Sequence, residues 1–226
     1  NYVRVGYSSV SYAMWLLCRD IRRKPLPELV AILQKKLADD DVTFSGYAVK
    51  GRTGIDGLGL NQFSRRYIYH LLARLTEATE IGAGRTETFD RLVDRTLKNP
   101  FDIEHIWADD YEIVKDQFST EQEFQDWRNH VASLLLLPAD VNRSLQDKPF
   151  PLKRVHYAKQ NFFAASLDSS VYEHQPQFQQ FSTKYELSFK FAEVFDKAEQ
   201  QVRRKLIAGL VELIWSPNRL CEAAHV

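Results

Sequence analysis

A glutamate and a histidine stand side by side in the segment Asp102-Ile103-Glu104-His105-Ile106, and this pair could divide two chemical tasks. A carboxylate holds a hard divalent cation through oxygen. An imidazole takes a proton from water near neutral pH. Adjacent side chains of a strand point to opposite faces, so a turn after the segment has to bring both groups to one substrate. A Glu-His pair on its own is more often a surface pair without chemistry.

Asn142 opens a second polar segment further along the chain. Its amide oxygen could bind a metal, although an asparagine at a helix start is also a common cap. Four basic residues follow it, Lys148, Lys153, Arg154 and Lys159. A local cluster of this kind engages phosphates even in a chain whose 30 Lys and Arg balance its 30 Asp and Glu. We therefore expect these four side chains to bind phosphate groups.

Other features of the sequence favour structural roles. His130 could enter the site and His156 could contact phosphate, but isolated histidines more often do neither. The glycines of 51–59 invite a phosphate-loop interpretation. They lack the Gly-Lys-Ser/Thr ending and follow no clear strand, so a flexible connector fits better.

The elements that must position the candidate residues are mainly helical. Apolar residues recur at helical spacing in five segments, 8–24, 29–37, 60–78, 86–97 and 186–215. Capping-box spacing at Ser119 and again at Thr120 predicts a further helix start. Alternation over 101–107 predicts a strand that runs into a loop, and the leucines of 133–138 are consistent with a buried strand. Residues 139–148 are expected to turn into a helix.

Composition limits the class of protein. The 226 residues are 44% hydrophobic and 12% aromatic, which is enough for a packed core and argues against disorder. The two cysteines, Cys18 and Cys221, exclude a disulfide scaffold and a four-cysteine zinc site and indicate a reduced, cytoplasmic setting. No apolar run reaches the roughly 20 residues of a membrane span. Because the chain starts at Asn1 rather than Met, we expect it to be a piece of a longer protein.

The two polar segments together resemble the HNH, or ββα-metal, nuclease motif. More narrowly, they resemble the C-terminal nuclease domain of GmrSD-type modification-dependent restriction enzymes and their SspE-like relatives. The similar blocks are 102–106, the leucines and proline of 134–138, and 142–157 with its asparagine, Lys-Pro-Phe, lysine and tyrosine. Residues 202–215 resemble the arginine-bearing helix that closes the domain. The blocks cover about half of the chain, and the first hundred residues match only loosely.

The resemblance implies a role for each candidate residue. His105 would be the general base for hydrolytic water, and Glu104 and Asn142 would bind one divalent ion, Mg²⁺ or Mn²⁺. Asp102 would support the site. The family usually has an asparagine that orients the histidine where this chain has Ser133, so Ser133 or a backbone carbonyl would have to take that role.

The expected fold is mainly α, with a small ββα-metal (HNH) unit at about 101–159 embedded between helices. Residues 1–100 would form a helical N-terminal part, and 101–226 the nuclease unit with its closing helices. The expected function is metal-dependent DNA cleavage, by nicking or double-strand cutting, in an antiviral restriction system. The resemblance also implies an upstream nucleotide-hydrolysing sensor domain of the same protein. Two alternatives remain open: a catalytically weak HNH-fold domain that binds DNA, and a helical regulatory or interaction module.

Overall fold

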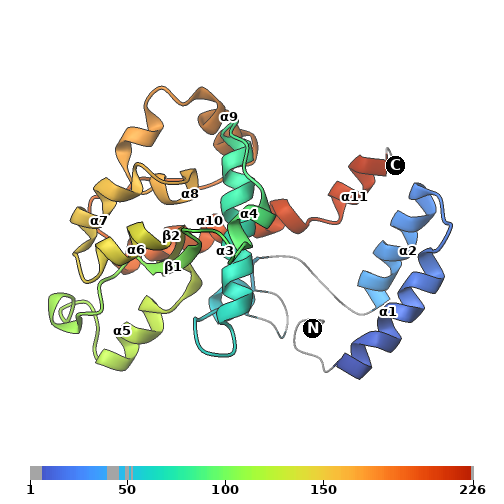
Figure 1. Cartoon of the computed structure of the whole chain (residues 1–226), viewed down its shortest axis with the longest axis horizontal. Helices are drawn as coiled ribbons and strands as arrows, with labels where there is room; N and C mark the ends of the chain where they lie inside the picture. The colour runs from blue at the N-terminus through green and yellow to red at the C-terminus, as the bar shows by residue number, and fades with distance from the viewer. Residues whose placement is uncertain (1–6, 40–45, 49–50, 52, 225–226) are drawn as a thin grey trace. The chain divides into compact units, whose positions relative to one another are not determined.

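The computed structural model describes residues 7–39, 46–48, 51 and 53–224. Contacts divide the chain into two compact units (Figure 1). Unit 1 combines 1–45 with 215–226, and unit 2 consists of 46–214. Within the described part of the chain, no helix has both the length and the apolar character that crossing a membrane requires.

Unit 1 is built from helices. They are α1 (Tyr7–Ile21), α2 (Leu26–Asp39) and α11 (Asn218–Ala224). An ion pair of 3.0 Å between Lys36 Nζ and Asp20 Oδ2 joins α2 to α1. On α11, the Cys221 sulfur lies 2.9 Å from Gln34 Nε2 of α2. Contacts between segments far apart in the sequence therefore hold this unit together.

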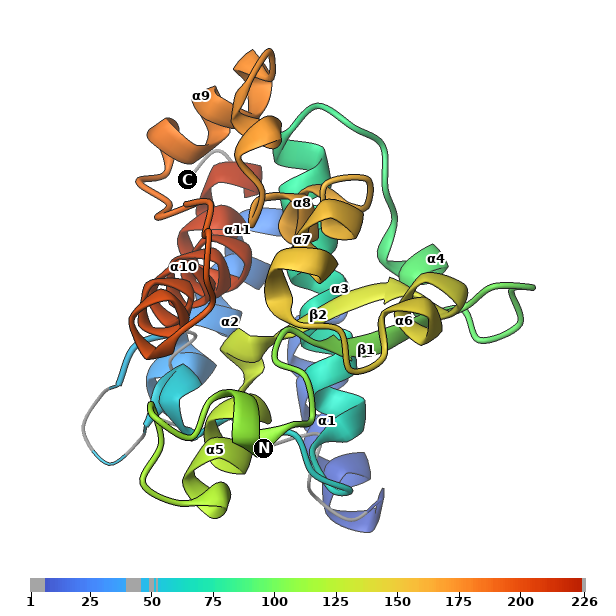
Figure 2. The same cartoon turned by 90° about the vertical axis from the view of Figure 1, so that its left-hand side faces the viewer.

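Unit 2 surrounds a two-stranded antiparallel sheet with helices (Figure 2). The strands are β1 (Phe101–His105) and β2 (Leu134–Pro138), with Phe101 opposite Pro138 and His105 opposite Leu134. The surrounding helices are α3 (Arg65–Gly82), α4 (Phe89–Val93), α5 (Glu121–Arg128), α6 (Ala139–Leu145), α7 (Phe150–Tyr157), α8 (Phe162–Ala165), α9 (Pro176–Lys184) and α10 (Lys197–Trp215). Since α3, α6 and α8 pack against β2, the strand is buried on both faces. This explains why all four leucines of β2 have no exposed surface.

Side chains cap the backbone at the outer border of β1. The Ile106 amide donates to the Ser133 carbonyl, so the alternation of an antiparallel ladder turns the carbonyls of Phe101, Ile103 and His105 away from β2. Each of these carbonyls accepts a hydrogen bond from a side chain. The donors include Tyr69 Oη for Phe101 (3.1 Å), Asn142 Nδ2 for Ile103 (3.2 Å) and Lys153 Nζ for His105 (2.8 Å). The three outward carbonyls of this border are therefore all hydrogen-bonded to side chains.

The structure confirms a mainly helical chain with one small antiparallel sheet. It shortens two expected helices. The helix expected over 186–215 begins only at Lys197. The apolar residues of 186–196 lie instead in a non-helical segment, in which the Ala192 amide donates to the Leu167 carbonyl. The helix expected over 86–97 is limited to α4, capped by Thr88. The expected division of the chain near residue 100 stays a prediction. The helices α3 and α4, which lie before that residue, belong to the same compact unit as the sheet.

Candidate functional site

Glu104 extends from β1 into a buried clasp formed by two side chains of α7. Lys153 Nζ and Tyr157 Oη each lie 2.8 Å from Glu104 Oε1. Only 4% of Glu104 and 1% of Lys153 is exposed, and Tyr157 is fully buried. Lys153 is four residues before Tyr157 on a helix, so both side chains come from one face of α7. The second carboxylate oxygen, Oε2, accepts no hydrogen bond from the residues that the structure describes.

The clasp balances charge inside the protein. Burial raises the pKa of Glu104, while the ammonium of Lys153 and the Tyr157 hydroxyl oppose that rise. Burial and the neighbouring carboxylate raise the pKa of Tyr157 well above its usual value, so this hydroxyl acts as a donor. A buried ion pair of this kind needs further hydrogen bonds to offset the loss of water. Here the His105 carbonyl accepts one from Lys153, which ties the clasp to the strand.

His105 points to α5 rather than into the clasp. Its Nε2 lies 3.1 Å from Asn129 Oδ1, and Asn129 directly follows α5. Asn129 Nδ2 donates to the Gln125 carbonyl at 2.9 Å, so the amide oxygen is the atom that faces the imidazole. An amide oxygen only accepts, so Nε2 carries the proton and Nδ1 keeps its lone pair. Asn129 thus orients His105 and leaves Nδ1 as the basic nitrogen.

The surroundings of His105 keep its imidazole uncharged. Burial lowers the pKa of His105 to about 4, and the nearby guanidinium of Arg128 adds to this effect, while the hydrogen bond to Asn129 opposes it. At neutral pH the ring is therefore in the form that accepts a proton.

Asn142 lies on α6, directly after β2. Because its Nδ2 donates to the Ile103 carbonyl at 3.2 Å, the amide is fixed at the outer border of β1. Lys153 meets the next outward carbonyl of the same border, that of His105. Consecutive outward carbonyls are roughly 7 Å apart along a strand. The structure therefore brings Asn142 to the same border as the Glu104 clasp, whereas the His105 ring lies against α5.

The remaining predicted residues are spread around this centre. Asp102 pairs with Arg95 at 3.2 Å near the start of β1. Lys148 Nζ donates to the Ser144 carbonyl at 2.7 Å, and Lys159 is exposed after α7. Arg154 pairs with Asp168 at 3.2 Å.

Ser133 contacts the backbone of α5 and a side chain of α10 rather than the histidine. Its Oγ donates to the Trp127 carbonyl at 2.8 Å and lies 2.8 Å from Gln200 Nε2. Both Ser133 and Gln200 are fully buried. The position where the resemblance suggested an orienting residue therefore forms part of the core.

Sequence reasoning missed Asn129 and Arg128. Both stand at the C-terminal end of α5, and no spacing rule connects that end to β1. A weak signal was present, since Asn129 and His130 follow the apolar face of the expected helix directly. Arg128 acts electrostatically on both Glu104 and His105, and 13% of its side chain is exposed.

The site has oxygen donors suited to a hard divalent ion, but few of them. Among the described residues, no three His, Cys, Asp or Glu side chains come close enough to hold a metal. Glu104 Oε2 and Asn142 Oδ1 are both oxygens without a hydrogen bond from a described residue. Magnesium is commonly bound by one or two carboxylates, with waters and substrate phosphates filling its other positions. By chemical type, these two oxygens could contribute to such a weakly held ion.

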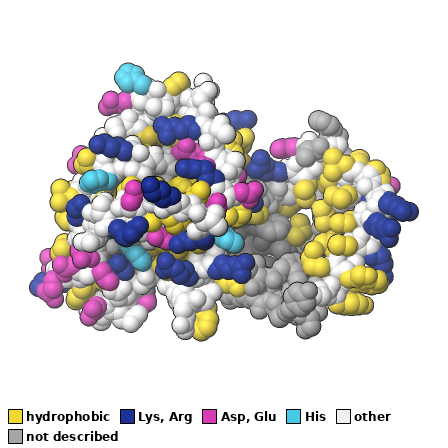
Figure 3. Space-filling view, viewed as in Figure 1, with side chains coloured by type: hydrophobic (Ala, Val, Ile, Leu, Met, Phe, Trp, Pro, Cys, Tyr) yellow, Lys and Arg dark blue, Asp and Glu magenta, His cyan; other side chains and the backbone are white. Residues whose placement is uncertain are grey.

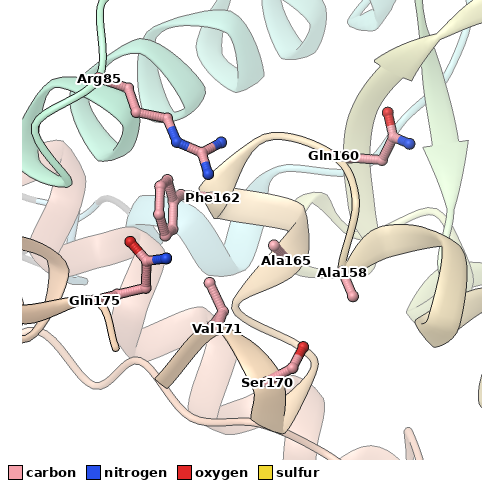
Figure 4. Close-up of a pocket in the computed structure, with 8 residues that line it drawn as sticks. All are labelled: Arg85, Ala158, Gln160, Phe162, Ala165, Ser170, Val171 and Gln175. Atoms are coloured by element: carbon pink, nitrogen blue, oxygen red, sulfur yellow. The ribbon is translucent and has the colours of Figure 1, made fainter. Parts of the chain in front are cut away.

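A separate cavity of about 100 Å³ lies between α8 and the segment 169–175 (Figure 4). It is lined by Arg85, Ala158, Gln160, Phe162, Ala165, Ser170, Val171 and Gln175. The Arg85 guanidinium lies 4.1 Å from the centre of the Phe162 ring. None of the candidate site residues lines this cavity.

Charges of both signs are distributed over the face of unit 2 that Figure 3 displays. Lys and Arg side chains are scattered across its middle, and acidic side chains gather at the end where α5 lies in Figure 1. The segment 109–126, which includes α5, is rich in acidic residues: Asp109, Asp110, Glu112, Asp116, Glu121, Glu123 and Asp126. On this face, a DNA contact would therefore use local cations rather than one continuous basic surface.

Comparisons with known proteins give one positive result. Searches of curated proteins and of solved structures found no match. A family model, "GmrSD restriction endonucleases, C-terminal domain", matches residues 58–187. The match covers more than half of the chain and includes both strands, the Glu104 clasp and the end of α5. The chain therefore belongs to the family of GmrSD restriction endonuclease C-terminal domains, a family of nucleases that act on DNA.

Proposed function

We propose that this domain hydrolyses DNA phosphodiester bonds with His105 as the general base. The observation that carries the proposal is the state of its imidazole: uncharged, held at Nε2 by Asn129, and with the lone pair of Nδ1 left to accept a proton. Family membership gives the reaction class, and this ring is the group suited to start it. The arrangement of β1, β2 and α6 around it is consistent with an HNH-type ββα unit.

The reaction follows from the position of the base. His105 Nδ1 takes a proton from water, and the water oxygen forms a bond to phosphorus. The bond from phosphorus to one bridging oxygen breaks, and that oxygen takes up a proton from solvent. One phosphodiester and one water thus give a phosphate monoester and a hydroxyl, and later loss of the proton from His105 restores the base.

A divalent ion, Mg²⁺ or Mn²⁺, would be held by Glu104 and Asn142. The chemistry it supplies is polarisation of the phosphate and stabilisation of the leaving oxygen. Lys153 and Tyr157 fix the Glu104 carboxylate so that Oε2 stays free, and the Ile103 carbonyl does the same for the Asn142 amide. Asp102 would support this arrangement through its pair with Arg95.

The basic residues after Asn142 divide into two groups in this proposal. Lys148 and Lys159 would contact DNA phosphates beside the site, and Arg154 would join them if its pair with Asp168 opens. Lys153 was expected to touch DNA from its place in the sequence. Its burial and its bond to Glu104 instead support a role in holding the carboxylate.

The family also supports a place in a restriction system. We propose that this system defends a cell against viral or modified DNA in the cytoplasm. A nucleotide-hydrolysing sensor domain of the same protein would then supply target selection, so that the present chain cuts with little specificity.

A supercoiled-plasmid assay tests the proposal. The wild-type chain is incubated with Mg²⁺ or Mn²⁺, with and without a chelator, and nicked and linear products are separated on a gel. His105→Ala should reduce the rate by the ~10²–10⁴-fold ascribed to a general base while DNA binding is kept. His174→Asn serves as a control, since His174 is exposed and has the left-handed backbone (φ 57°) that asparagine tolerates.

Each result has a distinct meaning. Cleavage that is blocked by chelator and lost in His105→Ala, but kept in the control, supports the proposal. Equal activity of His105→Ala removes the histidine from the mechanism. DNA binding with no cleavage under either metal favours the alternative of a binding domain, and no affinity for DNA favours the helical interaction module. An unchanged metal titration in Asn142→Ala would exclude that residue as a ligand.

A further inference from the structure

Arg128 is a largely buried cation whose one ion pair among the described residues, with Asp109, is long. Its side chain is 13% exposed, and its Nε is buried without a hydrogen bond from any residue that the structure describes. The nearest acidic group is Asp109, whose Oδ1 lies 3.7 Å from Nε, too far for a hydrogen bond. Glu104 and Asp147 also act on the charge from a distance, whereas burial lowers the pKa of Arg128.

The other cation of the site has the opposite character. Lys153 Nζ makes two contacts of 2.8 Å, with Glu104 Oε1 and the His105 carbonyl, and its charge is matched directly. Arg128 adjoins Asn129, the residue that orients His105, and it acts electrostatically on the imidazole. A guanidinium whose Nε has no hydrogen bond to a described residue therefore acts on the proposed base from the residue adjoining its orienting asparagine.

We propose that the Arg128 guanidinium binds the phosphate that is cleaved and holds it beside His105. This inference rests on the proposed function and names the protein group that receives the anionic substrate. A guanidinium presents its donors in a planar fork that matches phosphate oxygens, and hydrogen bonds between ionised partners are the stronger ones. A phosphate would supply the hydrogen-bond partner that Arg128 Nε lacks among the described residues.

The cost of leaving Arg128 unpaired supports this assignment. A buried donor without a partner reduces stability, and an unpaired buried charge reduces it further. If Arg128 served packing alone, its replacement would destabilise the fold. If it is held ready for an anion, its replacement by a neutral side chain of similar length should leave stability unchanged or raise it.

The experiment measures phosphate binding without catalysis. Thymidine 3′,5′-bisphosphate is titrated into the full chain in the presence of a chelator, and the Nε–H signal of Arg128 is followed by NMR, with affinities from calorimetry. Arg128→Gln should weaken binding roughly 10- to 100-fold, as expected for loss of hydrogen bonds to a charged group. Arg128→Lys should restore part of the affinity, because it keeps the charge but loses the fork.

Two further variants set the controls. Asp109→Asn removes the distant acidic neighbour and should tighten binding of the bisphosphate. Arg204→Gln changes an arginine that is similarly shielded (24% exposed) but paired with Asp56 at 3.3 Å, and it should leave the affinity unchanged.

The outcomes separate this inference from the proposed function. Loss of affinity in Arg128→Gln, with the melting temperature unchanged or raised, supports it, even if the wild-type chain fails to cut plasmid. Unchanged affinity in Arg128→Gln overturns it, even if the wild-type chain cuts. Loss of affinity together with a lower melting temperature also overturns it, because that pattern identifies a structural side chain.

Discussion

The imidazole of His105 and the amide of Asn129 meet at 3.1 Å, although one lies at the end of β1 and the other directly after α5. The Asn129 amide is itself fixed by the Gln125 carbonyl. The orientation of the proposed base thus depends on a helix end rather than on a residue of either strand.

Asn129→Ala should slow cleavage without weakening DNA binding. Loss of the hydrogen bond frees the ring to rotate, and misplacement of a catalytic group costs up to about 100-fold in rate. In Asn129→Asp a carboxylate faces Nε2, so the pKa of His105 should rise and the acidic limb of the pH–rate profile should move to higher pH. Measurements of kcat and KM from pH 4 to 8 check both variants. Gln122→Ala, an exposed change on α5, is the control, and a rate in Asn129→Ala equal to that of this control contradicts the assignment.

Disruption of the buried pair between Glu104 and Lys153 should destabilise the fold strongly. Either Glu104→Gln or Lys153→Met leaves one buried group without its counter-charge, at a cost of about 3–5 kcal/mol. The double variant should be more stable than the sum of the single changes predicts, because no charge is then left alone. Urea unfolding of all four proteins gives the coupling energy. Lys115→Met, which opens an exposed pair with Glu112, should have no measurable effect, and strict additivity in the cycle would argue against direct coupling.

Stability should fall as the pH drops from 6.5 to 4. Burial lowers the pKa of both His105 and His130 to about 4, so in this window the unfolded chain binds protons that the folded chain does not. The free energy of unfolding then decreases with falling pH, by at most ~1.4 kcal/mol per pH unit for each histidine, and this effect levels off below pH 4.

His130→Asn isolates one of these contributions. His130 Nδ1 accepts the Ala132 amide at 3.0 Å, and an asparagine oxygen is able to keep that contact without titrating. The variant should lose part of the slope between pH 4 and 6.5 and match the wild-type slope above pH 7. Unfolding by urea at a series of pH values tests this, and identical slopes would mean that His130 titrates normally.

Ser133→Asn should not improve the site, although the resemblance suggested an orienting asparagine there. Ser133 has no exposed surface, and its hydroxyl already serves Trp127 and Gln200. A larger side chain in this packed position should cost ~1–3 kcal/mol of stability. Thermal unfolding and plasmid cleavage together check the prediction. Faster cleavage by Ser133→Asn would show that position 133, rather than Asn129, controls the histidine.

Local patterns predicted the elements that carry the site. Alternation indicated β1, the leucine run ended by proline indicated β2, and one of the two capping boxes is used, since Thr120 accepts the Glu123 amide. These features depend on neighbours in the chain, which the sequence displays directly.

Contacts between residues far apart in the sequence could not be predicted from such local patterns. The clasp joins Glu104 to side chains of α7, and the alternation of β1 gave no sign that a charged residue would be buried there. Asn129 and Arg128 reach β1 only because α5 ends beside it. The helix predicted from residue 186 begins only at Lys197 for a related reason. Apolar residues at helical spacing can also lie in an irregular segment and still be packed.

The capped border of β1 has a consequence for assembly. A two-stranded sheet usually presents unpaired peptide groups that recruit a strand from another molecule. Here Tyr69, Asn142 and Lys153 occupy those groups on β1, and Asn161 Nδ2 takes the Leu136 carbonyl of β2 at 2.8 Å. An incoming peptide would have to displace the same side chains that hold the candidate metal oxygens in place. Strand addition through these carbonyls would therefore disturb Asn142 and Lys153, two residues of the candidate site.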